Sequence, residues 1–431
     1  MDYLPVLILI LSFVTLLAIG VPVAWSIAMS SLLTMLVNIA LLPAVTTVAQ
    51  RIGSGLDSFA LLAIPFFVLS GQLMNKGGIA NRLIAFAKTL VGSLPGGLAL
   101  INIISAMLMG AIAGSAMASA SAMGSILGPE MEKDGYSREF GAAVNITSST
   151  TGLIIPPSNV LIVYSLASGG VSIAALFLAG YIPGILTGLL LMLVAYLWAK
   201  KKKYAVGQRS SLREVFRTFI AAFPSLMLLV VVIGGIVVGI FTATEASAIA
   251  VLYTLILGLA YREISVRDLP GILLESVGTT AIVMLLIGAS MSMSWVMSYE
   301  NIPQDLSNAL LGISDNPIVI LIIINLLLLL VGIFMDMTPA VLIFTPIFLP
   351  IVTKLGMDPV QFGIIMVLNL CIGLCTPPVG SVLFVGVGVA NTTIERVVRP
   401  LLPLFLAMIA ALLLITFFPQ LSLWLPRLFG Y

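Results

Sequence analysis

The sequences Gly152-Leu-Ile-Ile-Pro-Pro-Ser-Asn159 and Gly373-Leu-Cys-Thr-Pro-Pro-Val-Gly380 each interrupt an apolar segment that is long enough to cross a bilayer. A Pro-Pro pair removes two backbone donors and disfavours helical geometry at the residue before it, so each helix has to stop and restart. Unwound backbone at membrane depth is tolerated where it lines a cavity or packs against protein. Two interrupted helices at matching places in two halves predict a transporter's binding site. The alternative is an ordinary loop at each Pro-Pro pair.

The composition is that of a polytopic membrane protein. Of the 431 residues, 60% are hydrophobic and 8% are charged, and the mean hydropathy is +1.21. The chain has no histidine and no GxxxxGK[ST] motif, which excludes a histidine relay, a histidine-ligated metal and ATP hydrolysis by that type of loop. Cys371 and Cys375 lie four positions apart on one apolar segment, where buried free thiols are favoured over a disulfide or a metal pair.

Residues 1–199 form the first of two units that the order of apolar segments predicts. Three spans come first. Residues 96–128 are too long for one span, and we interpret them as a re-entrant hairpin with its tip in the small-residue run Gly110-Ala-Ile-Ala-Gly-Ser-Ala116. A helix that packs closely through small residues is the alternative. The first broken helix follows at 137–168, and a whole span ends the unit.

Residues 218–431 repeat this order after a linker at 200–217. The second hairpin is predicted at 317–353, with its tip near Gly332-Ile-Phe-Met-Asp-Met-Thr-Pro339, and the second broken helix at 359–389. Short matches align the units: Lys133-Asp-Gly135 with Lys354-Leu-Gly356, Phe140-Gly141 with Phe362-Gly363, and Asn102 with Asn325.

The two units are predicted to be inverted relative to each other in the membrane. Each has five crossings, and an odd number reverses the direction of the second unit. In that unit we expect an interfacial arm at Ser265–Val277, a separate crossing segment at Thr279–Met297 and a last span at Pro400–Phe418. The predicted fold is therefore an all-α polytopic membrane protein of two inverted repeats, each with a re-entrant hairpin and a broken transmembrane helix.

The distribution of basic residues predicts the orientation. Lys and Arg favour the cytoplasmic side of a membrane. If the 200–217 linker is cytoplasmic, all of the 19 Lys and Arg residues except Arg51, Lys354 and Arg427 fall on the cytoplasmic side. Both termini are then predicted to be periplasmic, and the two hairpins enter the membrane from opposite faces.

The two hairpin tips and the two helix breaks are predicted to meet in one central site. A half-helix N-terminus there suits a carboxylate, and unwound carbonyls suit Na⁺. No Lys or Arg lies deep in a span, so Na⁺ and helix ends have to provide the positive field. Asp336 at the second tip is predicted either to cap a half-helix or to tune a cation site. Glu245 follows Phe241-Thr-Ala-Thr at the start of a span and is predicted to be an N-terminal cap.

With these residues the chain resembles the large membrane subunit of tripartite ATP-independent periplasmic (TRAP) transporters. The likeness runs nearly end to end. The motifs that carry it are Ile64-Pro-Phe-Phe-Val-Leu-Ser-Gly71, Gly114-Ser-Ala116, Gly152–Pro157, Phe241-Thr-Ala-Thr-Glu245, Met335-Asp-Met-Thr-Pro339 and Gly373–Pro378. The resemblance implies a Na⁺-driven secondary importer of organic acids in the bacterial inner membrane, with an elevator-type scaffold and transport domain. It also implies two partners: a small four-helix membrane subunit and a soluble periplasmic binding protein that delivers the substrate.

The resemblance also implies where sodium binds. One Na⁺ site would use backbone around Gly152, Ile155 and Pro157 together with the first tip. The other would use Gly332, Gly373, Thr376 and Val379. Similar proteins often have serines where this chain has Ala111 and Ala113, which leaves Ser115 as the hydroxyl of the first tip. No cofactor other than the coupling ion is expected.

Candidate substrate contacts lie next to the tips and breaks. They are Ser115, Ser158, Asn159, Asp336, Thr338, Gly380 and Ser381. The run Ser148-Ser-Thr-Thr-Gly-Leu-Ile-Ile-Pro-Pro-Ser-Asn159 looks closer to sialic-acid members of the family than to C4-dicarboxylate members. A C4-dicarboxylate or another sugar acid is the alternative substrate.

Two other classes of function fit the sequence less well. A channel needs a continuous polar pore, whereas the polar residues here concentrate at two breaks. An intramembrane enzyme needs a nucleophile and a base, and the chain has no histidine, no clustered acids and no deep lysine for a Ser/Lys dyad. No feature indicates nucleic-acid binding, and the surrounding medium is the lipid bilayer.

Overall fold

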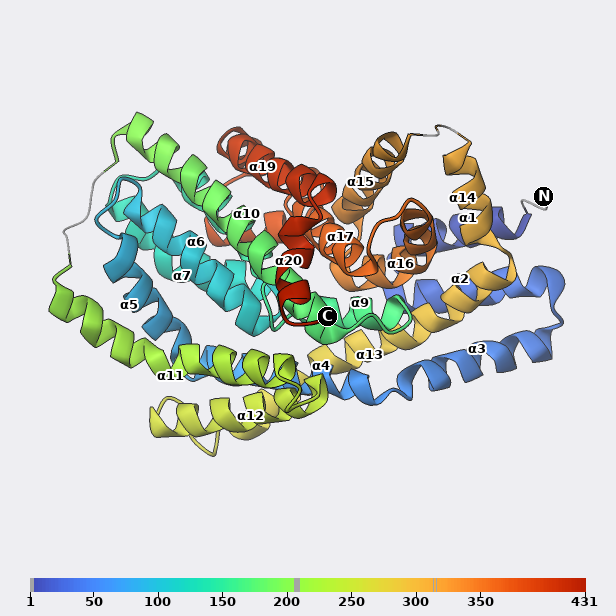
Figure 1. Cartoon of the computed structure of the whole chain (residues 1–431), viewed down its shortest axis with the longest axis horizontal. Coiled ribbons are helices and arrows are strands. Elements are labelled where there is room, and N and C mark those ends of the chain that lie inside the picture. Colours follow the sequence, from blue (N-terminus) through green and yellow to red (C-terminus); the bar gives the residue numbers. More distant parts are fainter. Residues whose placement is uncertain (1–3, 205–209, 313, 315) are drawn as a thin grey trace.

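The structure, a computed structural model, describes residues 4–204, 210–312, 314 and 316–431. In this part of the chain the protein is built of packed helices (Figure 1). The helices of the first half are α1 (Leu4–Ala18), α2 (Val23–Asn38), α3 (Leu41–Leu56), a short 3-10 turn (Phe59–Leu62), α4 (Ala63–Lys76), α5 (Ile79–Val91), α6 (Gly97–Ala113), α7 (Ala116–Lys133), α8 (Arg138–Thr151), α9 (Asn159–Ala167) and α10 (Ile173–Lys202). Those of the second half are α11 (Leu212–Val237), α12 (Ala243–Ala260), α13 (Leu269–Tyr299), α14 (Ile302–Leu311), α15 (Pro317–Phe334), α16 (Met337–Lys354), α17 (Pro359–Leu374), α18 (Ser381–Val389), α19 (Ile394–Phe417) and α20 (Gln420–Leu428).

The described part of the chain contains no β-strand, and eight of its helical segments are long and apolar enough to cross a membrane. The all-helical polytopic fold class is therefore confirmed. Figure 1 shows the helices packed side by side, with α11, α12 and α5 along one edge and α1, α2 and α14 at the far end.

The first predicted hairpin consists of α6 and α7, which are joined by only two residues. Gly114 has φ +61°, a left-handed conformation that glycine adopts without strain, and its N–H donates to the Gly110 carbonyl at 3.0 Å. Ser115 then caps α7 by accepting from the Ala118 N–H at 3.3 Å. The tip therefore lies at the end of the small-residue run, and residues 110–113 are still helical.

The second hairpin, α15 and α16, turns at Met335 and Asp336. Both residues have extended backbone, and Asp336 is at the N-cap position of α16. Its side chain makes no capping hydrogen bond, in contrast to that of Ser115. Both roles predicted for this carboxylate, capping of a half-helix and tuning of a cation site, stay predictions.

Each Pro-Pro pair separates two helices that lie inside the bundle. The first break, between α8 and α9, is buried at Leu153, Ile154 and Ser158. An ordinary surface loop at this place is therefore the wrong interpretation. The second break, between α17 and α18, is buried at Cys375 and is exposed at Val379.

The hairpins pack against both broken helices. The first hairpin helix lies on the first half-helix of its own unit, α6 on α8 and α15 on α17. The second hairpin helix lies on the second half-helix of the other unit, α7 on α18 and α16 on α9. The two free thiols join the broken helices, because Cys371 Sγ donates to the Thr150 carbonyl at 3.1 Å and Cys375 Sγ lies 3.5 Å from Thr150 Oγ1. This crossed packing brings both tips to both breaks.

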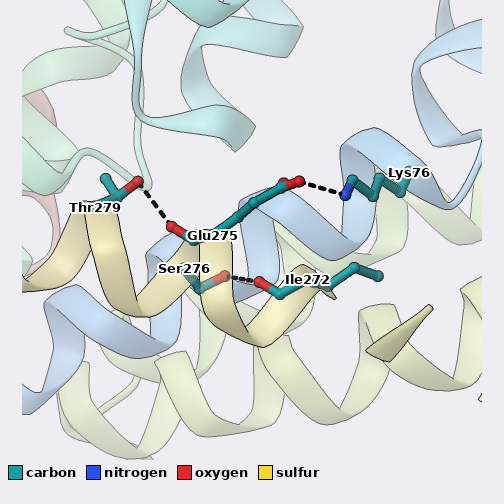
Figure 2. A network of polar contacts seen from close by, with 5 residues as sticks. All are labelled: Lys76, Ile272, Glu275, Ser276 and Thr279. Atoms are coloured by element: carbon teal, nitrogen blue, oxygen red, sulfur yellow. Dashed lines mark hydrogen bonds and ion pairs between the residues drawn. The ribbon is translucent and has the colours of Figure 1, made fainter. Parts of the chain in front are cut away.

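One expectation about the second unit is wrong. The interfacial arm and the crossing segment form a single helix, α13, of 31 residues. Gly278 does not interrupt it, because one helical glycine costs only about 1 kcal/mol and α13 gains packing against α2, α3, α4 and α16. Figure 2 shows the continuous turn: Thr279 donates to the Glu275 carbonyl at 3.1 Å, and Lys76 of α4 pairs with the Glu275 carboxylate at 2.9 Å.

The last span also begins earlier than expected, at Ile394 in α19 rather than at Pro400. Pro400 and Pro403 lie inside this helix, which membrane helices tolerate when neighbours satisfy the freed carbonyls. The helix α20, which lies on α10, was not expected from the sequence.

Candidate functional site

A small cavity of about 70 Å³ lies where the two tips and the two broken helices meet. Its polar side chains come from different parts of the chain: Ser115 from the first tip, Asp336 and Thr338 from the second tip, and Ser381 from the start of α18. Its other lining residues are Gly114, Ala116, Met117, Leu153, Val160, Met337, Leu374 and Val382. Four of the predicted substrate contacts are therefore brought together.

A second cavity, of about 260 Å³, adjoins the first. The two share Ser115 and Thr338, and the second adds Asn159 at the N-terminus of α9. On its other side the second cavity is lined by Gln72 and Asn75 of α4 and by Thr279 of α13. These three polar side chains lie on helices outside the hairpins and broken helices, and sequence reasoning missed them. The only feature of the sequence that could have indicated them is that each is a polar residue within a predicted membrane span.

Beside the first tip, the backbone of α6 contacts the backbone at the end of α8. A Cβ placed on Gly152 would lie 2.5 Å from Gly110 Cα and 2.8 Å from the Met107 carbonyl oxygen. No side chain can separate α6 from the end of α8, so the unwound backbone that begins at Gly152 lies directly against the hairpin. Ile155 packs on Gly184 of α10, where a Cβ would fall 2.5 Å from Ile155 Cγ1.

The second tip has the same construction. A Cβ on Gly373 would lie 2.5 Å from Gly332 Cα. Thr376 Oγ1 donates to the Ile372 carbonyl at 2.7 Å, which leaves the lone pairs of this oxygen available. Gly380 is the N-cap of α18, and a Cβ there would lie 2.5 Å from the Leu374 carbonyl oxygen. The predicted residues Gly332, Gly373 and Thr376 thus come together at one junction.

The two cavities are lined by one acidic side chain and by no basic one. Among the residues that line the two cavities, Asp336 is the only ionisable one, and no Lys or Arg lines either cavity. The Ser381 hydroxyl, next to it, has no hydrogen-bond partner within the protein. In its ionised form, a carboxylate beside hydroxyls and unwound carbonyls attracts a hard cation and repels an organic anion, so a bound cation or the half-helix N-termini would favour anion binding here.

Comparison with known proteins gives the family. Residues 10–421 match the family model described as tripartite ATP-independent periplasmic transporter, DctM component. The chain belongs to the TRAP transporter large permease family. The protein YgiK of Salmonella typhimurium is 56% identical over 426 residues, which cover 99% of this chain and 98% of that protein. Members of the family are transport proteins, so this permease is not an enzyme.

Two further relatives differ in the substrate that their names give. The isethionate TRAP transporter permease protein DctMQ of Oleidesulfovibrio alaskensis is 42% identical, over 98% of this chain and 67% of that protein. The sialic acid TRAP transporter large permease protein SiaM of Vibrio cholerae is 39% identical, over 96% of each chain. Among solved structures, the YdaH transporter of Alcanivorax borkumensis shares the fold, with a TM-score of 0.67 and 14% identity over 91% of both chains.

Some predicted site residues of this permease lie outside the linings of both cavities. Ser158 is buried, donates to the Leu153 carbonyl at 2.5 Å and accepts from the Leu161 N–H at 3.4 Å. Its hydroxyl is therefore occupied in holding the first break and capping α9. Pro157, Val379 and Gly380 are part of the breaks without lining either cavity.

Proposed function

We propose that this permease couples the entry of Na⁺ to the import of an organic acid. The supporting observation is the small cavity in which Asp336 is the only ionisable lining residue. Leu153 of the first break and Leu374 of the second break also line this cavity. A secondary transporter needs sites for cargo and coupling ion that depend on each other. Here Na⁺ would offset the Asp336 charge and supply the positive field that no Lys or Arg provides. The organic anion would then complete the site.

The two proposed sodium sites lie at the backbone contacts Gly110–Gly152 and Gly332–Gly373, which we call the two glycine junctions. The first comprises backbone at Gly152, Ile155 and Pro157 with Ser115 of the tip, and the second comprises Gly332, Gly373, Thr376 and Val379. Carbonyl and hydroxyl oxygens are the ligands that hard cations prefer. Carbonyl groups that no longer belong to a helix are free to turn toward the ion.

The substrate proposed is an organic acid that carries further polar groups. Its acid group would bind near Ser115, Thr338 and Ser381, and the rest would extend into the larger cavity beside Asn159. Sialic acid, a C4-dicarboxylate, another sugar acid and a small sulfonate are the candidates. The named relatives do not favour sialic acid over the others, since the isethionate permease is the more similar of the two.

We also propose that the permease works with two partner proteins and that part of it moves during transport. The permease would work in the bacterial cytoplasmic membrane with a small membrane subunit and a periplasmic binding protein. The hairpins and broken helices would move as one transport domain against a scaffold that includes α4, α12 and α13, in an elevator mechanism. The cavity that borders α4 and α13 would then be opened or closed by this movement.

The test is solute uptake into liposomes that contain the permease and its membrane partner, with the binding protein supplied outside. Uptake should require an inward Na⁺ gradient and should not run on a pH gradient alone. Sialic acid, succinate and isethionate, each with its own binding protein, cover the candidate substrate classes. Full activity with K⁺ in place of Na⁺ would refute the coupling, and uptake without saturation would indicate a channel.

A further inference from the structure

An ion pair lies one helical turn beyond the larger of the two site cavities. Lys76 Nζ of α4 and Glu275 Oε1 of α13 are 2.9 Å apart, and Figure 2 shows Glu275 between Lys76 and Thr279. Gln72 and Thr279 line the cavity of about 260 Å³, and they lie four positions from Lys76 and from Glu275, respectively. Residues four apart share one helix face, so the ion pair continues both polar faces toward the end of α4 and the start of α13.

The cavity is open on the side of this ion pair. Asn75, which directly precedes Lys76, lines the cavity and is exposed, and Thr279 is exposed as well. The end of α4 packs on α12 and α13 and forms a corner with them. A cavity of about 460 Å³ in this corner is lined by Lys76, Glu263, Ile264, Arg267, Asp268 and Gly271. The orientation predicted from the basic residues puts the corner on the cytoplasmic side, so Lys76 stands between the proposed site and the cytoplasm.

The two acids that line the corner cavity have partners other than Lys76. The Asp268 carboxylate accepts from the Ser265 N–H at 2.8 Å and from the Ser265 hydroxyl at 2.7 Å. The Glu263 carboxylate lies 3.9 Å from Arg82 Nη2. Glu275 is therefore the carboxylate that holds the Lys76 ammonium group in this structure.

The ion pair is weak enough to exchange partners. The side chains of Lys76 and Glu275 are 41% and 54% exposed. An ion pair with this much solvent around it contributes only about 0–1 kcal/mol to stability. An organic acid offers the ammonium group the same kind of partner as Glu275 does, because an ammonium group is a point charge that pairs with any anionic oxygen. The exchange of Glu275 for the acid group of a substrate therefore costs little.

We propose that Lys76 receives the acid group of the organic anion at the cytoplasmic opening of the site, and that Glu275 holds Lys76 until the anion arrives. This inference rests on the proposed function, because it takes the cavity beside Asn159 as part of the substrate site and the substrate as an acid. No Lys or Arg is among the residues that line the two site cavities. Lys76 would thus supply, on the way out, the positive charge that the lining of the site lacks.

A cysteine reporter in the cavity tests this role without depending on transport. Gln72→Cys is made in the full chain, and inside-out membrane vesicles are labelled at low ionic strength with two thiol reagents. One reagent is the anion 2-sulfonatoethyl methanethiosulfonate, and the other is the neutral methyl methanethiosulfonate. The mass of the chain gives both rates, and their ratio reports the attraction of an organic anion, since changes in thiol reactivity affect both reagents alike. The chain without the reporter, with buried Cys371 and Cys375, provides the background.

Lys76→Gln in the reporter chain should lower the ratio of anionic to neutral labelling about threefold, the effect of one unit charge at about 6 Å in water. Glu275→Gln should raise the ratio by a similar factor, because it frees Lys76 and removes a negative charge. Lys88→Gln is the matched control and should leave the ratio unchanged. Lys88 forms an ion pair of similar exposure with Glu130, at 3.4 Å, and lines neither site cavity.

A ratio that stays the same in Lys76→Gln, or that falls equally in Lys88→Gln, would overturn the role of Lys76. So would a reporter that the neutral reagent does not label from the cytoplasmic face, since the cavity would then be closed to this side. A fall in Lys76→Gln without a rise in Glu275→Gln would keep the receiving role of Lys76 and overturn the holding role of Glu275. Uptake that ignores Na⁺ would refute the proposed coupling and leave the labelling result standing.

Discussion

Gly332 and Gly373 lie in direct backbone contact, with the position of a Gly373 Cβ only 2.5 Å from Gly332 Cα. Gly110 and Gly152 have the same relationship in the first unit, again at 2.5 Å from Cβ to Cα. In both units a hairpin helix reaches the end of a broken half-helix with no side chain in between. Close approach of this kind requires glycine on both partners. It also places the unwound carbonyls beside the tip that would share the ion.

The glycine contacts predict the effect of a single methyl group. Gly373→Ala and Gly152→Ala should each lower the free energy of unfolding by about 1–3 kcal/mol, because the new Cβ meets backbone that cannot rotate away. Thermal unfolding of the purified protein gives the measurement. Gly388→Ala on α18 is the control, since nothing lies within 4 Å of its Cβ position, and it should be neutral or stabilising. A Gly373→Ala protein as stable as the control would contradict the close backbone contact between Gly332 and Gly373.

The helix interruptions at both Pro-Pro pairs and the turn at Gly114 were predictable because proline and glycine act locally. Pro-Pro pairs end a helix wherever they occur, and Gly114 followed by a capping Ser115 defines a turn within a few residues. The separate interfacial arm before α13 was wrong for the opposite reason. A polar segment followed by Gly278 resembles a boundary, and packing against four other helices decides that the helix continues.

The candidate site was predictable only in part. Asp336 and Ser115 were found because an acid or hydroxyl at a helix break is unusual in a membrane segment. Gln72, Asn75 and Thr279 were missed because nothing in the sequence shows that α4 and α13 border the first tip. Ser158 was assigned to the substrate from its place beside the prolines, whereas its hydrogen bonds to Leu153 and Leu161 use its hydroxyl for the fold.

The start of α12 predicts a purely structural role for an acid. Thr242 Oγ1 accepts from the Glu245 N–H at 3.2 Å, and the Glu245 carboxylate accepts from the Thr242 N–H at 2.8 Å, which together form a capping box. The capping role expected for Glu245 is thus confirmed. Thr242→Ala should lower the unfolding free energy by about 1 kcal/mol. Uptake should keep its Na⁺ dependence in both Thr242→Ala and Glu245→Gln, and a changed half-saturating Na⁺ concentration in the latter would give Glu245 a part in transport.

The charge distribution predicts the orientation of the chain. A cysteine introduced at Lys200 should be shielded from impermeant thiol reagents in intact cells, while one introduced at Tyr431 should be labelled. The buried Cys371 and Cys375 make the unsubstituted chain a suitable blank. Labelling at Lys200 with protection at Tyr431 would reverse the orientation, and protection at both positions would place the C-terminus on the same side as the linker.

The outer surface predicts that this chain does not transport alone. Large apolar side chains are exposed along α1 and α11, among them Leu7 at 55% and Val230 at 63%. Lipid covers such surfaces, and so does another membrane protein. Liposomes that contain the chain without a small membrane subunit or a binding protein should show no Na⁺-driven uptake, while the complete system does. Robust uptake by the isolated chain would refute the proposed dependence on partners.

Thr376→Val tests whether a hydroxyl at the second break binds Na⁺. The alternative role, capping of α18, does not fit the structure, because Gly380 is the N-cap and the Thr376 hydroxyl donates backward to Ile372 at 2.7 Å. That bond uses the hydroxyl hydrogen and leaves the oxygen lone pairs free for a cation. Valine keeps the shape and removes only the oxygen. If the oxygen is a ligand, the half-saturating Na⁺ concentration for uptake should rise about tenfold, which corresponds to about 1.4 kcal/mol.

Thr254→Val separates this effect from the loss of a hydrogen bond. Thr254 on α12 makes the same kind of bond, from Oγ1 to the carbonyl four residues earlier, Ala250, at 2.8 Å. Thr254 Oγ1 also lies 3.0 Å from the Val251 carbonyl oxygen, so Thr254→Val removes at least as much hydrogen bonding as Thr376→Val, and each variant should lose about 1 kcal/mol of stability. Only Thr376→Val should shift the Na⁺ dependence when the two proteins are reconstituted at equal density. An identical half-saturating concentration in both variants would remove the Thr376 hydroxyl from the ion site and leave the carbonyl oxygens of the second break as the candidate ligands.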